Sequence, residues 1–444
     1  MQEFDRLNKG MHVTNEHTKR MDIRVTAVEI SYEVETVTDL KTGKSVRANT
    51  LTEGPSGFQL TWGAVANFIK LHVGFAIPVN RIQMMIGQPE ITSGKICRVL
   101  HYVAEALDEI YLCLAWQLAD ANELAGDDTN TKVLELHSES STDTVALLDE
   151  ELGFTQPYAN GEGEKKKINV SLLVGKTDVD PRSTIRFFRT HLGSVGNLLT
   201  KILENRSPKL GPLVIQGDLS TTNLPSKEIR EKITILLAGC AAHARRPFWR
   251  FKEEDESLCY FMLRGFLMLS QVEAMIDARG RTHQKVLKLR GRYAKMIWLA
   301  MRNRCIAAIT GKAPSPGTYP VGINPNRWPP GSNLYLAAQY VINHFDELTL
   351  YLSYPRLDPT NNGRERALRI EKCMLNSSKF RKTKRGRVIL DILRTINATC
   401  TTAGVDITDY LRFVFMAGNE AKFHPENYTP FEFAKKTKLL LAAI

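Results

Sequence analysis

The segment LDPTNNGRERALR, residues 357–369, places one carboxylate, Glu365, near the start of a predicted helix that is rich in arginine. Asn361 and Asn362 are typical N-cap residues, and Glu365 follows Asn362 by three positions, which is the spacing of a capping box. Glu365 could therefore satisfy a backbone amide and pair with Arg369 one turn later. It could also bind a catalytic metal ion, but only together with carboxylates from elsewhere in the chain.

Two aspartates are candidate partners for Glu365. Metal-dependent phosphoryl transfer on DNA needs hard oxygen ligands that hold Mg²⁺ and leave coordination sites for water and phosphate. Asp218 directly follows a short apolar strand-like segment, and α/β sheets present functional groups at the carboxyl ends of their strands. Asp127 precedes a β-branched segment in LAGDDTNTKVLEL. Both are also common turn residues, Asp127 could cap a helix, and no local pattern separates them from the other aspartates.

The elements that must position these carboxylates alternate between strand-like and helical patterns. Residues 59–118 read as two short helices before a longer one, which fits a helix-turn-helix-like module or ordinary helical packing. Residues 119–239 alternate strands with helices, which predicts an α/β sheet. The pattern is mostly helical from Glu231 to about Tyr351, so a long helical segment separates the sheet from Glu365.

The composition favours a globular protein with a polyanionic partner. Lysine and arginine number 59 against 48 aspartates and glutamates, a formal net charge of +11, which fits nucleic acid better than an acidic small molecule. The seven cysteines are scattered, without the spacing of a zinc module or a disulfide framework, and indicate a reducing cytoplasm. No apolar run reaches the roughly 18 residues of a membrane span, so we expect no membrane partner.

Basic residues gather near the predicted Glu365 helix and after the sheet. The run KFRKTKRGR, residues 379–387, holds six basic residues in nine and predicts salt-sensitive contacts with the DNA backbone, the alternative being a solvated loop. Arg245 and Arg246 could reach phosphates or form surface ion pairs. Cys240 and His243, three residues apart, would share a helix face, and we expect them to anchor the helical segment structurally.

Several segments together resemble the insertion-sequence-sixty-six family of transposases, the TnpC-type DDE transposases. Asn361-Asn362-x-x-Glu365-Arg366-Ala-Leu-Arg369 is similar to the signature around the catalytic glutamate of that family. GCAAHARRPFWRF and ELAGDDTNTKVLEL resemble two further family segments, the second of which holds its first aspartate. The resemblance extends over about residues 60–430 in the order of the family.

The resemblance implies that Asp127, Asp218 and Glu365 are the catalytic, metal-binding triad. The cofactor would be two Mg²⁺ ions, with Mn²⁺ as a substitute, and the reaction would be cleavage and strand transfer of insertion-sequence DNA ends. The expected partners are the terminal repeats and target DNA, a homo-oligomer on DNA, and, as further candidates, accessory proteins of the same element, in the cytoplasm near the nucleoid. The candidate DNA contacts are Arg245, Arg246, Arg366, Arg369, Lys379, Arg381, Lys382, Lys384, Arg385 and Arg387, with structural roles for Cys240, His243, Asn361 and Asn362.

The resulting fold class is α/β, a ribonuclease-H-like core interrupted by an all-α insertion and preceded by a helix-turn-helix-like module. We predict a variable, partly β segment (1–58), the helical module (59–118), the first part of the core (119–239), the insertion (240–354), the end of the core with the Glu365 helix (355–400) and a helical tail (401–444).

The sequence departs from the family at Thr360, Ala241 and Leu375–Ser377. No cysteine precedes Cys97, so the N-terminal zinc-binding segment of the family is not expected. These departures leave an alternative function open, a catalytically inactive, transposase-derived protein that binds DNA or assists assembly.

Overall fold

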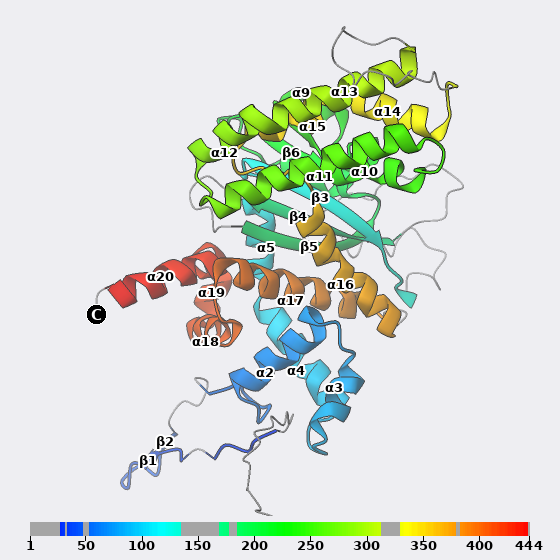
Figure 1. Ribbon diagram of the computed structural model, residues 1–444. Helices are drawn as coiled ribbons and strands as arrows, with labels where there is room; N and C mark the ends of the chain where they lie inside the picture. Colours follow the sequence, from blue (N-terminus) through cyan, green and yellow to red (C-terminus); the bar gives the residue numbers. More distant parts are fainter. Residues whose placement is uncertain are drawn as a thin grey trace, which may run out of the picture.

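Five strands form a mixed sheet at the centre of the fold, in the order β5-β4-β3-β6-β7 (Figure 1). β3, β4 and β5 form an antiparallel meander, whereas β6 and β7 run parallel to β3. The strands are β3 (Glu123–Asn130), β4 (Ile168–Lys176), β5 (Thr184–Leu192), β6 (Leu213–Gly217) and β7 (Ile235–Gly239). The computed structural model describes residues 27–31, 33–47, 53–134, 168–176, 184–311, 329–378 and 382–442. The predicted mixed α/β class is confirmed.

Helices cover both faces of the sheet, which explains why β4 is buried along almost its whole length. On one face, Leu172 packs in a small cluster with Leu368 of α16 (Asn362–Ser378). On the other face, Leu173 belongs to the main hydrophobic core, which includes α8 (Val195–Leu203). α16 is the helix that contains Glu365.

The outer edge of β5 is closed by α17 (Lys384–Ala403). Asp391, Thr395 and Thr399 are four residues apart on this helix. Their side chains accept hydrogen bonds from alternate backbone amides of residues 186–190, at 2.7, 2.9 and 3.4 Å respectively. An edge strand exposes every second amide, and these three side chains satisfy the ones that no neighbouring strand pairs.

The helices of residues 62–117 pack with the C-terminal helices. They are α2 (Trp62–Ile69), the π-helical turn η1 (Lys70–Gly74), α3 (Val79–Ile86), α4 (Ser93–Ala106) and α5 (Asp108–Gln117). The C-terminal helices are α18 (Ile407–Ala417), α19 (Asn419–Phe423) and α20 (Pro430–Ala442). The Trp62 ring lies 4.5 Å from that of Phe415, centroid to centroid, within the main core. The predicted helical character of residues 59–118 is therefore present, while a DNA-reading role for these helices stays a prediction.

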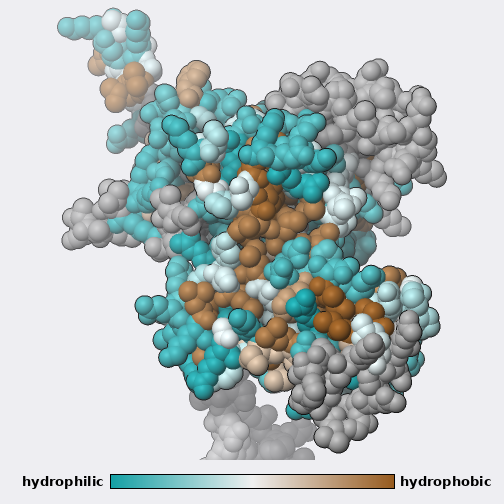
Figure 2. All heavy atoms as spheres, turned by 90° about the horizontal axis from the view of Figure 1, so that it is seen from above, coloured by the Kyte–Doolittle hydropathy of each residue, from teal (hydrophilic) through white to brown (hydrophobic). Residues whose placement is uncertain are grey.

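A second hydrophobic core is formed by the helices between β7 and α16. They are α10 (Ala241–Arg250), α11 (Glu256–Ala278), α12 (His283–Leu289), α13 (Lys295–Thr310), α14 (Asn333–Asn343) and α15 (Phe345–Thr349), with η3 (Arg290–Ala294) and η4 (Leu350–Leu352) as short turns. Figure 2 looks onto the molecule from above, the side on which these helices lie, and shows hydrophobic residues gathered in the middle of this face. Leu267 and Met268 on α11 and Met296 on α13 are among the exposed apolar side chains of this unit.

Among the described helices, α11 alone has the length and hydropathy of a membrane span. It packs against α10 and α13, and Met262, Leu269 and Ile276 lie in the second core. We therefore interpret α11 as the central helix of this unit.

The structure corrects one expectation about strands. The pattern from Glu231 onward predicts helix, but residues 235–239 form β7, because a short apolar run reads equally well as a buried strand. In the segment predicted to be partly β, residues 1–58, the described residues pair as an exposed hairpin of β1 (Thr36–Thr38) and β2 (Ser45–Arg47).

Candidate active site

The register of β3 and β6 brings Asp127 and Asp218 to the same edge of the sheet. Glu123 lies opposite Val214 and Ala125 lies opposite Gln216, so matching positions are 91 residues apart. Asp127 and Asp218 are also 91 residues apart, and they occupy the matching positions just beyond the last pair. Asp127 is thus inside β3, and the interpretation of this residue as a turn or helix cap is wrong.

Asp127 and the adjacent Asp128 point to opposite faces of the sheet. Asp127 lies opposite Leu172, which packs against Leu368 of α16, so Asp127 is on the α16 face. Asp128 is on the other face, where its Oδ2 accepts a hydrogen bond of 3.0 Å from the backbone amide of Val195, at the start of α8. The two neighbouring aspartates therefore differ in their surroundings. Asp128 binds the start of α8, whereas Asp127 lies on the α16 face of the sheet.

The pKa of the Asp128 carboxyl depends in part on the charge of Asp218. Burial raises its pKa, the hydrogen bond from the Val195 amide offsets part of that rise, and the negative charge of Asp218 raises it further. The negative charge of Asp218 thus reaches Asp128 on the neighbouring strand.

Asp218 is held in a turn immediately after β6. Its Oδ1 accepts hydrogen bonds from the Ser220 amide at 3.0 Å and from Asn223 Nδ2 at 2.8 Å, so the turn predicted from its local sequence does form. The Tyr340 hydroxyl donates to the backbone carbonyl of Asp218 at 3.0 Å. Leu219 follows with a φ of 63°, a left-handed conformation that is rare for a bulky residue and concentrated at functional sites. Asp218 is therefore held at one side-chain oxygen and at its backbone carbonyl.

Three hydrogen bonds attach the segment before α16 to the same edge of the sheet. Gln216 Nε2 on β6 donates to the Asp358 carbonyl at 2.5 Å, and the Ala241 amide donates to the Pro359 carbonyl at 2.9 Å. The Asn361 amide donates to Cys240 Sγ at 3.2 Å. The N-terminus of α16 consequently starts next to the strand ends that carry the two aspartates.

Glu365 lies in the first turn and a half of α16, and its side chain, like the others of residues 362–366, lies outside the described part of the structure. The helix begins at Asn362, one residue earlier than a capping box with Asn362 as its cap requires. Asn361 therefore occupies the position before the helix, and Glu365 is the fourth helical residue.

Cys240 occupies the position after β7 that matches Asp218 in the β6–β7 register. Burial alone would raise the pKa of its thiol. Hydrogen bonds from the His243 side chain and from the Asn361 and His243 amides outweigh burial and hold the pKa below its ordinary value. Cys240 and His243 thus act on each other and on the start of α16.

The predicted DNA-contacting residues fall into three groups. Arg245, Arg246, Arg369, Lys382 and Arg385 are exposed, and Arg385 pairs with Glu105 on α4. Lys379 and Arg381, and the side chains of Arg366 and Lys384, lie outside the described residues. The third group is Arg387 alone, which is fully buried.

The expectation that Arg387 contacts DNA is wrong. Its guanidinium pairs with Glu371 and Asp391, at 3.0 Å each, and Arg394 also pairs with Glu371. Thr131 Oγ1 donates to Glu371 at 3.0 Å, which connects this buried ion cluster to the chain just after β3. Sequence reasoning missed the cluster, although the spacing of four residues between Arg387 and Asp391 was a signal for an ion pair on one helix.

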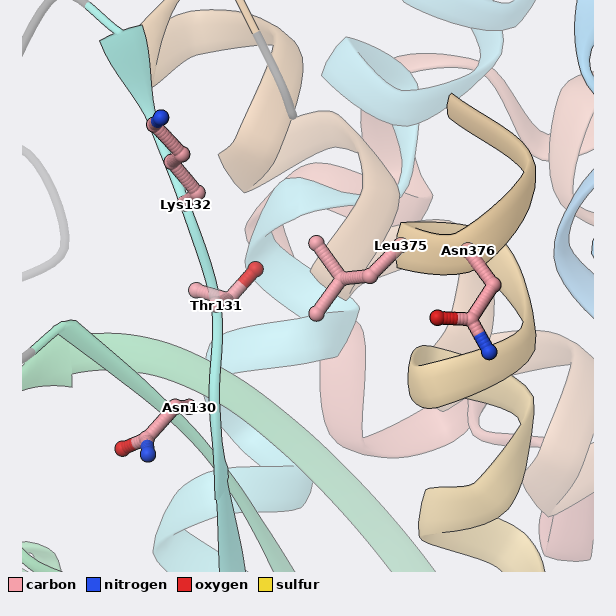
Figure 3. Close-up of a pocket in the computed structure, with 5 residues that line it drawn as sticks. All are labelled: Asn130, Thr131, Lys132, Leu375 and Asn376. Atoms are coloured by element: carbon pink, nitrogen blue, oxygen red, sulfur yellow. The ribbon is translucent and has the colours of Figure 1, made fainter. Parts of the chain in front are cut away.

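A shallow cavity of about 490 Å³ lies beside the end of β3. Figure 3 shows Asn130, Thr131 and Lys132 on one side and Leu375 and Asn376 of α16 across from them. Leu375 and Asn376 are among the positions at which the sequence departs from the expected family pattern. The cavity continues the α16 face three residues beyond Asp127.

Among the described side chains, no three of histidine, cysteine, aspartate and glutamate come together as a metal site. Asp127 and Asp218 provide hard carboxylate oxygens at this edge of the sheet, and these are the donors that Mg²⁺ takes. The side chain of Glu365, the third predicted ligand, is not among those that the structure describes.

Comparison with known families places these features in context. Residues 188–388 match the model of the family described as Transposase IS66 family. The predicted family is confirmed. The IS66 match includes Asp218, Cys240 and Glu365, while Asp127 lies before it. No curated protein and no solved structure gave a match. The match to this transposase family indicates a transposase role and, with it, binding to DNA.

Proposed function

We propose that this protein is a DDE transposase that cleaves insertion-sequence ends and transfers the strands in a Mg²⁺-dependent reaction. The observation that carries the proposal is the β3–β6 register, because it puts Asp127 and Asp218 at matching positions on one sheet edge. The segment that starts α16, the helix of Glu365, is hydrogen-bonded to the same edge. We further propose that the five-stranded sheet with α16 is the ribonuclease-H-like core and that residues 240–354 are an insertion into it.

In this proposal, Asp127, Asp218 and Glu365 would hold the metal ions. When bound, the ions supply Lewis acidity and lower the pKa of a coordinated water or hydroxyl, which supports in-line attack on a phosphodiester. The chain itself contributes orientation. The turn formed with Ser220 and Asn223 holds the Asp218 carboxylate.

The exposed cations suit the substrate. Arg245 and Arg246 on α10, Arg369 on α16 and Arg385 on α17 are exposed cations, and contacts of such residues with phosphates give affinity without reading sequence. We propose that the DNA backbone is bound by these residues, in the cytoplasm and as an oligomer that holds two ends.

The test compares neighbouring carboxylates. The full-length protein is incubated with Mg²⁺ and DNA that carries the repeats flanking its own genomic locus, and nicking and joining are scored on gels. Asp127→Asn, Asp218→Asn and Glu365→Gln should abolish both activities while DNA binding persists. Asp128→Asn is the matched control, because this residue is adjacent to Asp127 but faces α8, and this variant should keep cleaving.

Cleavage that survives in Asp127→Asn or Asp218→Asn would remove that residue from the proposed triad. A wild-type protein that binds the repeats but neither nicks nor joins them, with Mg²⁺ or with Mn²⁺, would instead support the inactive DNA-binding or assembly protein.

A further inference from the structure

Trp249 is an exposed aromatic residue on α10 whose ring contacts two cations. Its side chain is 56% exposed, whereas the preceding Phe248 is fully buried in the second core. Lys252 Nζ lies 4.6 Å and Arg245 Cζ 5.7 Å from the centroid of the Trp249 ring. The helix thus buries Phe248 in the second core and exposes Trp249 to solvent among positive charges.

The surroundings of Trp249 favour a polyanion that also carries flat rings. Arg245, Arg246, Arg250 and Lys252 are all exposed on α10 or just after it. Glu253 and Glu254 follow directly, so the run of positive charge along the chain ends at Lys252. A nucleic-acid strand satisfies both requirements, since its phosphates pair with the cations and its bases stack on aromatic side chains.

The energies favour a stacked base over the contacts seen without DNA. A single exposed cation–π contact contributes less than the stacking of a base on an aromatic side chain. A base that displaces Lys252 or Arg245 from the ring also releases that cation to an adjacent phosphate. The exchange is therefore favourable for an unpaired base, while a base inside a duplex keeps its own stacking partners.

The position of Trp249 is compatible with the proposed cleavage site. α10 begins directly after Cys240, which is level with Asp218 at the end of the parallel strands. Trp249 lies nine residues further, or about 13 Å along the helix at 1.5 Å per residue. That length corresponds to about four stacked nucleotides at 3.4 Å each.

We propose that Trp249, with Arg245 and Lys252, is a stacking site for an unpaired base of the DNA strand near the cleavage position. This inference rests on the proposed function, because it takes DNA as the substrate. It adds a binding site for an unpaired base to the proposed phosphate contacts of α10.

The test measures binding without Mg²⁺, so it does not depend on catalysis. Two probes are used: a fully paired duplex of the terminal repeat, and the same duplex with four unpaired nucleotides at the cleavage position. Wild type should prefer the second probe. Trp249→Ala should lose about 5- to 150-fold in affinity for the unpaired probe and little for the duplex. Trp249→Phe should keep most of the preference but lose the quenching of tryptophan fluorescence by the unpaired strand.

Tyr260→Ala is the matched control, since Tyr260 is 68% exposed at the start of the next helix, and it should bind both probes like wild type. Thermal unfolding of each variant verifies that it is folded. The proposal is overturned if Trp249→Ala weakens both probes equally, if it weakens neither, or if Tyr260→Ala has the same effect. Because cleavage is scored separately, an inactive triad with an intact stacking preference would contradict only the catalytic proposal.

Discussion

Replacing Glu371 with glutamine should destabilise the protein strongly, because this residue neutralises two buried arginines. Its carboxylate is 1% exposed and pairs with Arg387 and Arg394, which are 0% and 3% exposed. With Asp391 the cluster contains two positive and two negative side chains, so Glu371→Gln leaves one positive charge uncompensated inside the protein.

Two estimates of the loss agree. Removing one partner of a buried ion pair costs about 3–5 kcal/mol in the free energy of unfolding. Counted as hydrogen bonds, the change weakens two charge-assisted bonds from Arg387 and Arg394, each contributing about 1.5–3 kcal/mol. The Thr131 hydroxyl can still donate to the glutamine, so that bond is retained. Glu371→Gln should therefore remove a large fraction of the free energy of unfolding, which is about 5–15 kcal/mol for a typical domain.

The assay is denaturant unfolding of the full-length chain at low and high salt. Glu231→Gln is the control, because Glu231 forms an exposed pair with Lys227 at 3.7 Å, and its loss should cost under about 1 kcal/mol. The effect of Glu371→Gln should persist at high salt, whereas any effect of Glu231→Gln should fade, since buried pairs are screened much less. A loss below about 1 kcal/mol for Glu371→Gln, or one that salt removes, would refute the reasoning.

Three further outcomes are expected. Gly196→Ala should cost about 1–3 kcal/mol, because a Cβ there would collide with backbone oxygens of the loop after β6, whereas Gly211→Ala meets open space and should be neutral; urea midpoints compare them. Cys240→Ala should cost about 1–3 kcal/mol because the amide of Asn361 loses its acceptor. Since the folded thiol pKa is lowered, the stability advantage of wild type over this variant should grow as the pH rises towards 9.0 and shrink on acidification, and a pH-independent difference would contradict this. Asp128 has a raised folded pKa, so the unfolded state loses its proton first and wild-type stability should fall as the pH rises above 3.8; Asp128→Asn should lack that slope in a pH series of unfolding curves.

Much of the architecture was predictable from the sequence, because it rests on local periodicity. The helices of residues 62–117 and 241–349 follow apolar patterns of helical period. β7 was not predicted, since its five residues are too few for a period to separate strand from helix. Its assignment depends on pairing with β6, which is a property of the folded sheet.

The candidate site, too, could be predicted only in part from local sequence patterns. Asp127 and Asp218 could be selected only through family resemblance, because the register that aligns them joins strands 91 residues apart in the chain. Charge counting also misplaced Arg387, which lies in a basic run but turns its side chain into the core. A run of basic residues shows only the local composition. The direction in which each side chain points depends on the helix that forms and on the surface against which that helix packs.

The closure of β5 by α17 also restricts how copies of this protein can assemble. Each alternate amide of residues 186–190 already donates to a side chain of the helix, so no further strand can join the sheet at that edge. A complex that holds two DNA ends therefore cannot be built as a continuous sheet through β5. Any contact between copies of the protein must come from other surfaces, and the five-stranded sheet stays closed on this side.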